Sequence, residues 1–134
     1  MSSPISPDLV YKLRNVGDPA LSPDGSRLAY SQSWVEQEAG MEIRSRIMML
    51  DLTGGEGREF TQGNKDSVPK FSPDGLTLAF LRSDESSRRQ VWQMQAGGGE
   101  ARLVTHSLGG VTEFSCTLSG LSVSPSQRSE RSKR

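Results

Sequence analysis

The stretch Asp18-Pro-Ala-Leu-Ser-Pro-Asp-Gly-Ser-Arg-Leu-Ala-Tyr30 decides the fold, because it returns fifty residues later as Val68-Pro-Lys-Phe-Ser-Pro-Asp-Gly-Leu-Thr-Leu-Ala-Phe80. In each copy, Ser-Pro-Asp-Gly suits a tight turn. Proline presets φ at about −65°, aspartate tolerates the bridge region between helix and sheet, and glycine accepts positive φ. Because apolar residues flank the turn on both sides, each copy predicts a β-hairpin.

The strand that follows each turn has two different faces. In the second copy, the period of two places Leu78 and Phe80 on one face and Ala79 on the other. The first copy has the same alternation. We expect the alanine side to allow an adjacent sheet to approach closely, because its side chain is small.

Each hairpin is followed by a short apolar run, which reads Ile47-Met-Met-Leu50 in the first copy and Val91-Trp-Gln-Met94 in the second. A glycine turn then leads into two matching tails, Gly54-Gly-Glu-Gly-Arg-Glu-Phe-Thr61 and Gly98-Gly-Glu-Ala-Arg-Leu-Val-Thr105. Four short strands in a unit of about 40–50 residues are typical of propeller blades, which pack radially. The predicted fold class is therefore all-β, a partial β-propeller of about two four-stranded antiparallel blades.

The pattern divides the chain into four predicted segments. These are a leader with a short helix over residues 1–15, a first blade over 16–66, a second blade and the start of a third over 67–114, and a disordered Ser/Arg-rich tail over 115–134. The helix is expected over residues 7–14, with Ser6 as N-cap and Pro7 as the first helical residue.

The repeat breaks in its third unit. Val111-Thr-Glu-Phe-Ser115 parallels the start of the second copy, but the chain continues as Cys116-Thr-Leu-Ser-Gly120 where Pro-Asp-Gly is expected. We hypothesise that the coding frame is lost near Ser115 and that the propeller is cut short there. Blades bury their faces only against neighbours, so we also expect self-association through exposed blade edges.

Charge and composition exclude several classes of function. Sixteen basic residues balance sixteen acidic ones, so no net field draws the chain to nucleic acid or to an anionic membrane. No apolar run reaches the roughly 18 residues that a membrane-spanning helix needs. The beginning of the sequence lacks the pattern of a secretory signal, and Cys116 is the single cysteine. We predict a cytoplasmic location without nucleic-acid or membrane partners.

The first copy and its leader resemble the start of the propeller domain in serine peptidases of the S9 (prolyl oligopeptidase) family, especially acylaminoacyl-peptidase-like members. The ending of the second copy, residues 91–105, is similar to blade endings of that family and of TolB-type propellers. The resemblance covers roughly residues 6 to 115. It implies a propeller that caps an α/β-hydrolase domain and filters access, so that short peptides reach the active site and folded proteins do not.

The resemblance places all of the chemistry in that other domain, on a Gly-x-Ser-x-Gly nucleophile followed by Asp and His. This sequence has no Gly-x-Ser-x-Gly, and His106 is its only histidine. We therefore predict no catalytic, cofactor-binding or metal-binding residue, leave substrate-binding residues unassigned, and expect an inactive chain that meets peptide substrate only within a complete peptidase. The alternatives are a TolB-like protein-binding module and a non-functional truncated product.

Several residues have the chemistry of a phosphate-binding or metal-binding site, but we assign them structural roles. The run Gly97-Gly-Gly-Glu100 resembles a phosphate cradle but is followed by a predicted strand, so a turn is expected. Asp24 and Asp74 are interpreted as turn residues without clustered metal ligands. His106 and Cys116 lie ten residues apart without companion ligands, far from zinc spacing.

Two further features carry weaker functional hypotheses. Trp34 lies in the stretch 31–45, interpreted as a long loop between strands. This loop lines an access channel, contacts a partner or simply meets solvent. The pair Arg88-Arg89 has the chemistry to receive a peptide carboxylate, although a solvated charge pair is the expected role.

Overall fold

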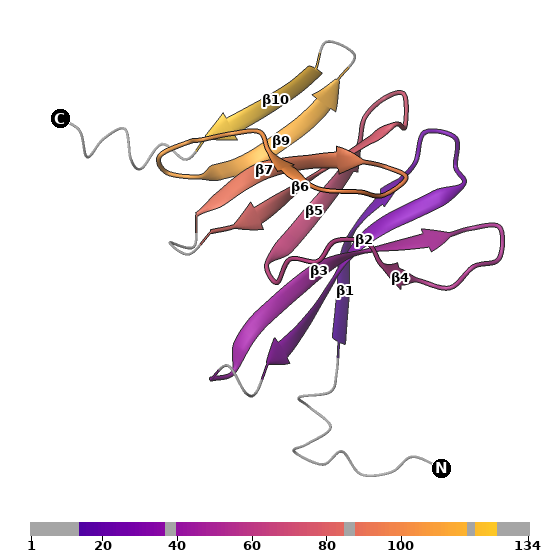
Figure 1. Cartoon of the computed structure of the whole chain (residues 1–134), viewed down its shortest axis with the longest axis horizontal. Coiled ribbons are helices and arrows are strands. Elements are labelled where there is room, and N and C mark those ends of the chain that lie inside the picture. Colours follow the sequence, from indigo (N-terminus) through magenta and orange to yellow (C-terminus); the bar gives the residue numbers. More distant parts are fainter. Residues whose placement is uncertain (1–13, 37–39, 85–87, 118–119, 126–134) are drawn as a thin grey trace.

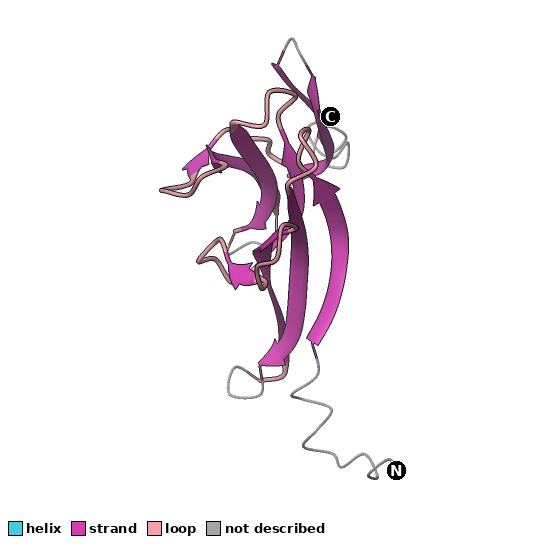
Figure 2. Ribbon diagram, turned by 90° about the vertical axis from the view of Figure 1, so that its right-hand side faces the viewer, coloured by secondary structure: helices cyan, strands magenta, loops and turns pink. Residues whose placement is uncertain are grey.

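A computed structural model describes residues 14–36, 40–84, 88–117 and 120–125 of the chain. These residues form ten strands and their connections. Figure 2 shows strands and loops, and no helix, in this part of the chain. None of the described segments is therefore a helix that could cross a membrane.

The strands form two four-stranded sheets and one hairpin, all antiparallel, and within each of them consecutive strands are neighbours (Figure 1). Blade 1 contains β1 (Arg14–Leu21), β2 (Arg27–Glu36), β3 (Glu42–Asp51) and β4 (Arg58–Glu59). Blade 2 contains β5 (Asp66–Phe71), β6 (Thr77–Ser83), β7 (Arg89–Gln95) and β8 (Arg102–Leu103). The third hairpin contains β9 (Val111–Thr117) and β10 (Gly120–Pro125). The predicted all-β fold with two four-stranded antiparallel blades is confirmed.

The two Ser-Pro-Asp-Gly turns have the same geometry. In blade 1, the Gly25 N–H donates to the Ser22 carbonyl at 2.9 Å, and Gly25 has a φ of 76°. The Asp24 carboxylate accepts from the Ser22 hydroxyl at 2.7 Å and from the Ser26 N–H at 2.9 Å. Gly75 in blade 2 has the same φ of 76°. The turn chemistry predicted from the sequence therefore forms twice.

The first strand of each blade contains a β-bulge at an equivalent position. The register shifts between Gly17 and Ala20 in β1, and between Ser67 and Lys70 in β5. Within the bulges, Asp18 and Val68 have φ values of 50° and 51°. Positive φ is costly for the β-branched Val68, so the surrounding blade imposes this bend.

The first core lies between the facing sides of blades 1 and 2. Ala29, Ile47 and Met49 of blade 1 pack against Leu78, Phe80 and Met94 of blade 2, and all six are buried. The alternation predicted for the second copy is confirmed, because Leu78 and Phe80 face blade 1 and Ala79 faces the other way. Blade packing thus stabilises the fold, since neither sheet buries its apolar face alone.

The second core differs from the prediction for the end of the chain. Val111 and Phe114 of the third hairpin pack against Ala79, Leu81 and Val91 on the far side of blade 2. Cys116 and Leu121 join this cluster as partly buried residues. Disorder was predicted from residue 115 onward, yet the structure forms strand pairs as far as residue 125, because these apolar residues have blade 2 to pack against. Residues 126–134 lie outside the described residues.

The predicted helix and the predicted long loop have different outcomes. The helix predicted over residues 7–14 lies outside the described residues except for Arg14, which begins β1. The loop predicted over residues 31–45 is wrong, because β2 and β3 continue as one long hairpin that pairs Trp34 with Arg44. Cross-strand pairs of polar and aromatic side chains extend this hairpin beyond the apolar run that marked it in the sequence.

Candidate functional site

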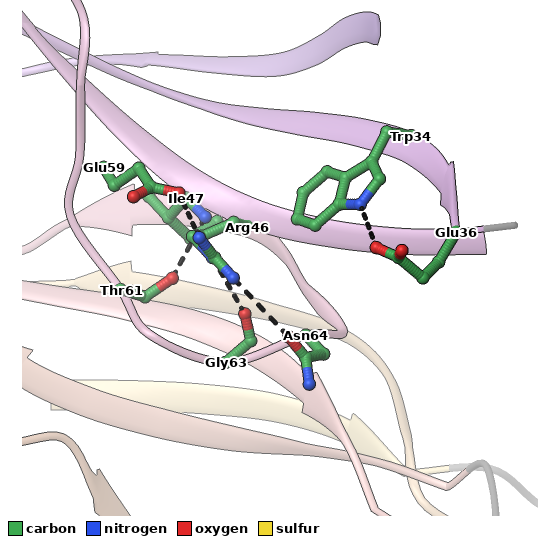
Figure 3. Close-up of polar contacts among 8 residues, drawn as sticks. All are labelled: Trp34, Glu36, Arg46, Ile47, Glu59, Thr61, Gly63 and Asn64. Atoms are coloured by element: carbon green, nitrogen blue, oxygen red, sulfur yellow. Dashed lines mark hydrogen bonds and ion pairs between the residues drawn. The ribbon is translucent and has the colours of Figure 1, made fainter. Parts of the chain in front are cut away.

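The junction between blades is the part of the molecule where the polar side chains converge. Each blade ends in the threonine that the repeat marked. The Thr61 hydroxyl accepts a hydrogen bond from the Ile47 N–H at 3.0 Å (Figure 3), and the Thr105 hydroxyl accepts one from the Val91 N–H at 2.9 Å. Both threonines thereby attach the end of a blade to its third strand.

Ile47 and Val91 are each preceded by a polar residue, Arg46 and Gln90. The side chain of this residue holds the segment that follows the blade. Arg46 Nε donates to the Gly63 carbonyl at 3.1 Å, and the Arg46 guanidinium also pairs with Glu59 (Figure 3). At the equivalent position of blade 2, Gln90 Nε2 donates to the Ser107 carbonyl at 2.7 Å. Two different side chains therefore perform the same structural task, which the sequence repeat does not reveal.

The central polar pair of the junction joins Asp66 and Arg82 across β5 and β6. Arg82 Nε and Nη2 donate to the two carboxylate oxygens of Asp66 at 2.7 and 3.1 Å, in the bidentate geometry that favours arginine. Asp66 is fully buried, and Arg82 lies over the Trp92 ring at 4.6 Å. Blade 2 therefore holds an ion pair with a buried carboxylate and a partly exposed guanidinium on the face that meets blade 1.

Arg82 also lines two hollows of the described surface. One has a volume of about 430 Å³ and the other about 510 Å³. The first hollow is lined by three cations and two carboxylates, namely Arg44, Lys65, Arg82, Glu42 and Asp84. Lys65 and Glu42 form an ion pair at 2.7 Å, which lowers the pKa of the Glu42 carboxyl. Together with Asp66, which pairs with Arg82, three carboxylates balance the three cations, so no net charge favours an anion or a cation here.

Trp34 lies on β2, in the long hairpin of blade 1, opposite Arg44 of β3. Its Nε1 donates to Glu36 at 3.1 Å, and the Arg46 guanidinium lies 5.2 Å from its ring (Figure 3). The indole is thus fixed within the long hairpin by its own strand and the next one.

The turn aspartates behave as structural residues. Hydrogen bonds from the Ser26 N–H and hydroxyl, together with the Ser22 hydroxyl, lower the pKa of Asp24 to about 2. The Ser72 hydroxyl and the Leu76 N–H likewise lower the pKa of Asp74. The described residues contain no cluster of three or more His, Cys, Asp or Glu side chains that could hold a metal ion.

The remaining candidate residues are placed apart from one another. His106 is exposed in the connection between β8 and β9. Cys116 is partly buried in the second core, and burial raises the pKa of its thiol. Arg88 and Arg89 are exposed at the start of β7. The 97–100 run forms the connection between β7 and β8, with Gly98 at a φ of 116°.

The geometry brings none of these groups together as a nucleophile with a base. The structure brings Asp66 and Arg82 together as a pair, and it places Arg46 and Gln90 separately at the ends of blades 1 and 2, where each holds the segment that follows its blade. Sequence reasoning found only the threonines of these junctions, because they recur at the end of both copies. Asp66 and Arg82 occur in the second copy alone, so no repeat marks them.

Comparison with known proteins gives related peptidases. The chain is 38% identical over 114 residues to the uncharacterized peptidase YuxL of Bacillus subtilis, which covers 84% of this chain and 17% of that protein. It is 25% identical over 114 residues to dipeptidyl-peptidase 5 of Porphyromonas endodontalis, covering 84% of this chain and 16% of that protein. The chain thus spans about a sixth of the length of these relatives. No family model matches the chain.

Solved structures share the fold at lower identity. The acylaminoacyl peptidase of Pyrococcus horikoshii matches with a TM-score of 0.67 and 21% identity, over 80% of this chain and 16% of that one. The β-propeller domain of the Trilobed protease from Pyrococcus furiosus matches with a TM-score of 0.64 and 18% identity, over 78% and 31%. A TolB-type protein of Agrobacterium tumefaciens matches with a TM-score of 0.62 and 22% identity, over 83% of this chain and 38% of that one.

The repeated turns, the strand order and the two cores between blades define this chain as part of a β-propeller. Within that class, the two relatives that match over 84% of the chain are peptidases, and the predicted resemblance to the propeller of S9-type peptidases is confirmed.

Proposed function

We propose that this chain supplies non-catalytic blades to the propeller of an S9-type peptidase, and that the intact propeller controls which peptides reach an α/β-hydrolase domain outside this chain. The observation that carries the proposal is the 38% identity to a peptidase along 84% of the chain. A match of that length includes both Ser-Pro-Asp-Gly turns, so it extends over both blades.

The structure supports a rigid structural role for these blades. Each blade end is attached by a threonine hydroxyl, and the junction between blades contains the Asp66–Arg82 ion pair beside an apolar core. A ring built of such units resists opening between adjacent blades, because separating them would expose six buried apolar residues and a charged pair. A rigid ring of this kind suits the selection of substrates by size.

A TolB-like protein-binding module is the second candidate. The TolB-type protein of Agrobacterium tumefaciens supports it, with a TM-score of 0.62 over 83% of this chain. By sequence, the similarity to a TolB protein of Novosphingobium aromaticivorans extends over 62 residues, 45% of this chain. We favour the peptidase because its sequence match is longer. The predicted cytoplasmic location and the predicted lack of catalytic activity stay predictions.

An exchange of segments tests the proposal. The stretch of YuxL that matches this chain is replaced by the corresponding residues of this chain, and hydrolysis of a short peptide and of a folded protein is measured. We expect the chimera to be labelled by a serine-hydrolase probe, to cleave the peptide and to spare the folded protein. The unmodified YuxL is the control. A probe-reactive chimera that cleaves both substrates would contradict the proposed gating role, and a chimera without soluble product would contradict the equivalence of the blades.

A further inference from the structure

The two hollows that Arg82 lines both lie along the seam between blades 1 and 2. The first hollow, of about 430 Å³, lies between the start of β3 and the end of β6. The second hollow, of about 510 Å³, lies between the residues that follow β4 and the connection from β7 to β8. Each hollow thus has one wall from blade 1 and one from blade 2, so its shape does not depend on a further blade.

The carboxylates at the first hollow are already occupied by donors. The two oxygens of Glu42 accept from Lys65 at 2.7 Å and from Arg44 at 3.5 Å. Asp84 Oδ1 accepts from a backbone N–H at 3.0 Å. Both oxygens of the buried Asp66 are occupied by the guanidinium of its ion pair. A ligand that needs acceptors would therefore have to compete with existing bonds.

Two guanidinium groups, in contrast, retain donors. Arg82 uses Nε and Nη2 on Asp66, and no described residue accepts a hydrogen bond from its Nη1. Arg44 reaches Glu42 only through Nη2, and its Nε is buried without a partner, which is unfavourable. The Arg44 side chain is 25% exposed, so it can turn towards an incoming acceptor. The first hollow therefore offers surplus donors without surplus charge.

The second hollow adds an apolar floor to the seam. Phe60, Met94 and Ala101 line it, and all three pack in or against the first core. Apart from Arg82, whose charge is already paired, the charged residue of this lining is Glu100. A ligand carboxylate would meet the like charge of Glu100 here, whereas an apolar side chain would meet carbon atoms.

We propose that the seam binds an uncharged, extended stretch of peptide, which places a main-chain carbonyl on the Arg82 Nη1 and an apolar side chain in the second hollow. A peptide carbonyl is a neutral acceptor, and surplus donors without net charge favour such a group. Successive residues of an extended peptide lie about 3.3 Å apart, so a segment of a few residues passes from one hollow to the other at Arg82.

This inference rests on the proposed function and adds the kind of peptide that the propeller meets. A propeller that admits peptides would hold their uncharged, apolar segments at this seam, outside the hydrolase domain. Recognition through a main-chain carbonyl is independent of sequence, and selectivity then comes from the apolar floor of the second hollow.

Methyl NMR of the methionines, during titration of the purified chain with N-acetyl-Ala-Leu-Ala-amide, tests the proposal. We expect a saturable shift of the Met94 methyl, with a dissociation constant in the millimolar range, because a short peptide gains few contacts against the entropy cost of association. Met41 is the internal control, since it is 47% exposed and lines neither hollow. The Arg82 Nε–H signal should shift together with Met94.

Charged peptides provide the test of selectivity. The peptides with Asp or Lys in place of the central Leu should bind about tenfold more weakly, because an unpaired charge would lie beside Phe60 and Met94. Acetylation and amidation remove the terminal charges, so the central side chain is the only difference between the three ligands.

Arg44→Lys separates the role of the donors from that of the charge. Lysine retains the positive charge and loses the planar fork of donors, so we expect the leucine peptide to bind about threefold more weakly. Arg102→Lys is the matched control, because Arg102 is exposed on β8 and lines neither hollow, and it should leave binding unchanged. Circular dichroism verifies that both variants retain their strand content.

Each of the following results would overturn the proposal: no saturable shift of Met94 up to about 20 mM peptide, an equal shift of Met41, equal affinity for the three peptides, or equal affinity of the Arg44→Lys and Arg102→Lys variants. Binding is measured on this chain alone. A failure here therefore leaves the YuxL chimera free to support the proposed function, and an inactive chimera leaves peptide binding at the seam measurable.

Discussion

The Thr61 side-chain hydroxyl accepts a hydrogen bond from the Ile47 backbone N–H at 3.0 Å, where both residues are buried. Replacing Thr61 with Val keeps the shape of the side chain and removes the acceptor, so the buried N–H loses this partner. We expect Thr61→Val to lower the free energy of unfolding by about 1–3 kcal/mol, measured by urea denaturation. Thr61→Ser retains the hydroxyl, so its free energy of unfolding should fall clearly less than that of Thr61→Val. Equal losses in the two variants would contradict the role of the hydrogen bond.

The Asp66–Arg82 pair predicts a large effect when only one partner is removed. Asp66→Asn leaves the Arg82 guanidinium without its carboxylate at the junction between blades, and we expect a loss of about 3 kcal/mol or more in the free energy of unfolding. A double-mutant cycle with Arg82→Met measures the coupling. The double variant should lower the free energy of unfolding by much less than the sum of the two single-variant losses, because neither charge then remains unpaired. Additive losses would show that the pair is not coupled.

The features of this fold that could be predicted from the sequence are those that recur in both blades. The Ser-Pro-Asp-Gly turns and the two threonines recur at fixed spacing, so hairpins and blade ends were predictable from the residues alone. Asp66 and Arg82 occur in one copy, and only the register of β5 against β6 brings them together. Sequence spacing contains no information about such a register until the bulge between Ser67 and Lys70 is known.

The end of the described chain illustrates the same limit. Cys116 and Leu121 read as part of a polar tail, because their apolar neighbours are few in the sequence. Both contact the core behind blade 2, which residues far away in the chain provide. Tertiary burial therefore determines strand formation in β10, and local composition does not.

The close approach between Gly63 and Asp66 predicts intolerance of a larger side chain. A Cβ atom at Gly63 would lie 2.4 Å from both carboxylate oxygens of Asp66. We expect Gly63→Ala to lower the free energy of unfolding by about 1–3 kcal/mol, because the ion pair must shift. Gly97→Ala is the control, since nothing lies within 4 Å of its added Cβ. The prediction fails if both variants unfold at the same urea concentration.

The turn of blade 1 predicts a specific acid titration. Because the hydrogen bonds of Ser26 and Ser22 lower the pKa of Asp24 to about 2, its contribution to stability is complete above the ordinary aspartate pKa of 3.8. That contribution is lost as the pH falls from there through about 2, since protonation then favours the unfolded chain. Carboxyl carbon NMR of Asp24 should give a midpoint near pH 2 in the folded protein. A midpoint at the ordinary value would contradict the turn geometry.

The most direct test of the central claim, that this chain forms propeller blades and carries no catalytic site, is labelling of the purified chain with a fluorophosphonate probe for serine hydrolases. The account predicts no labelled serine by mass spectrometry under conditions that label an intact S9-type peptidase. Stoichiometric labelling of one serine in the folded chain, abolished by heat denaturation, would contradict it.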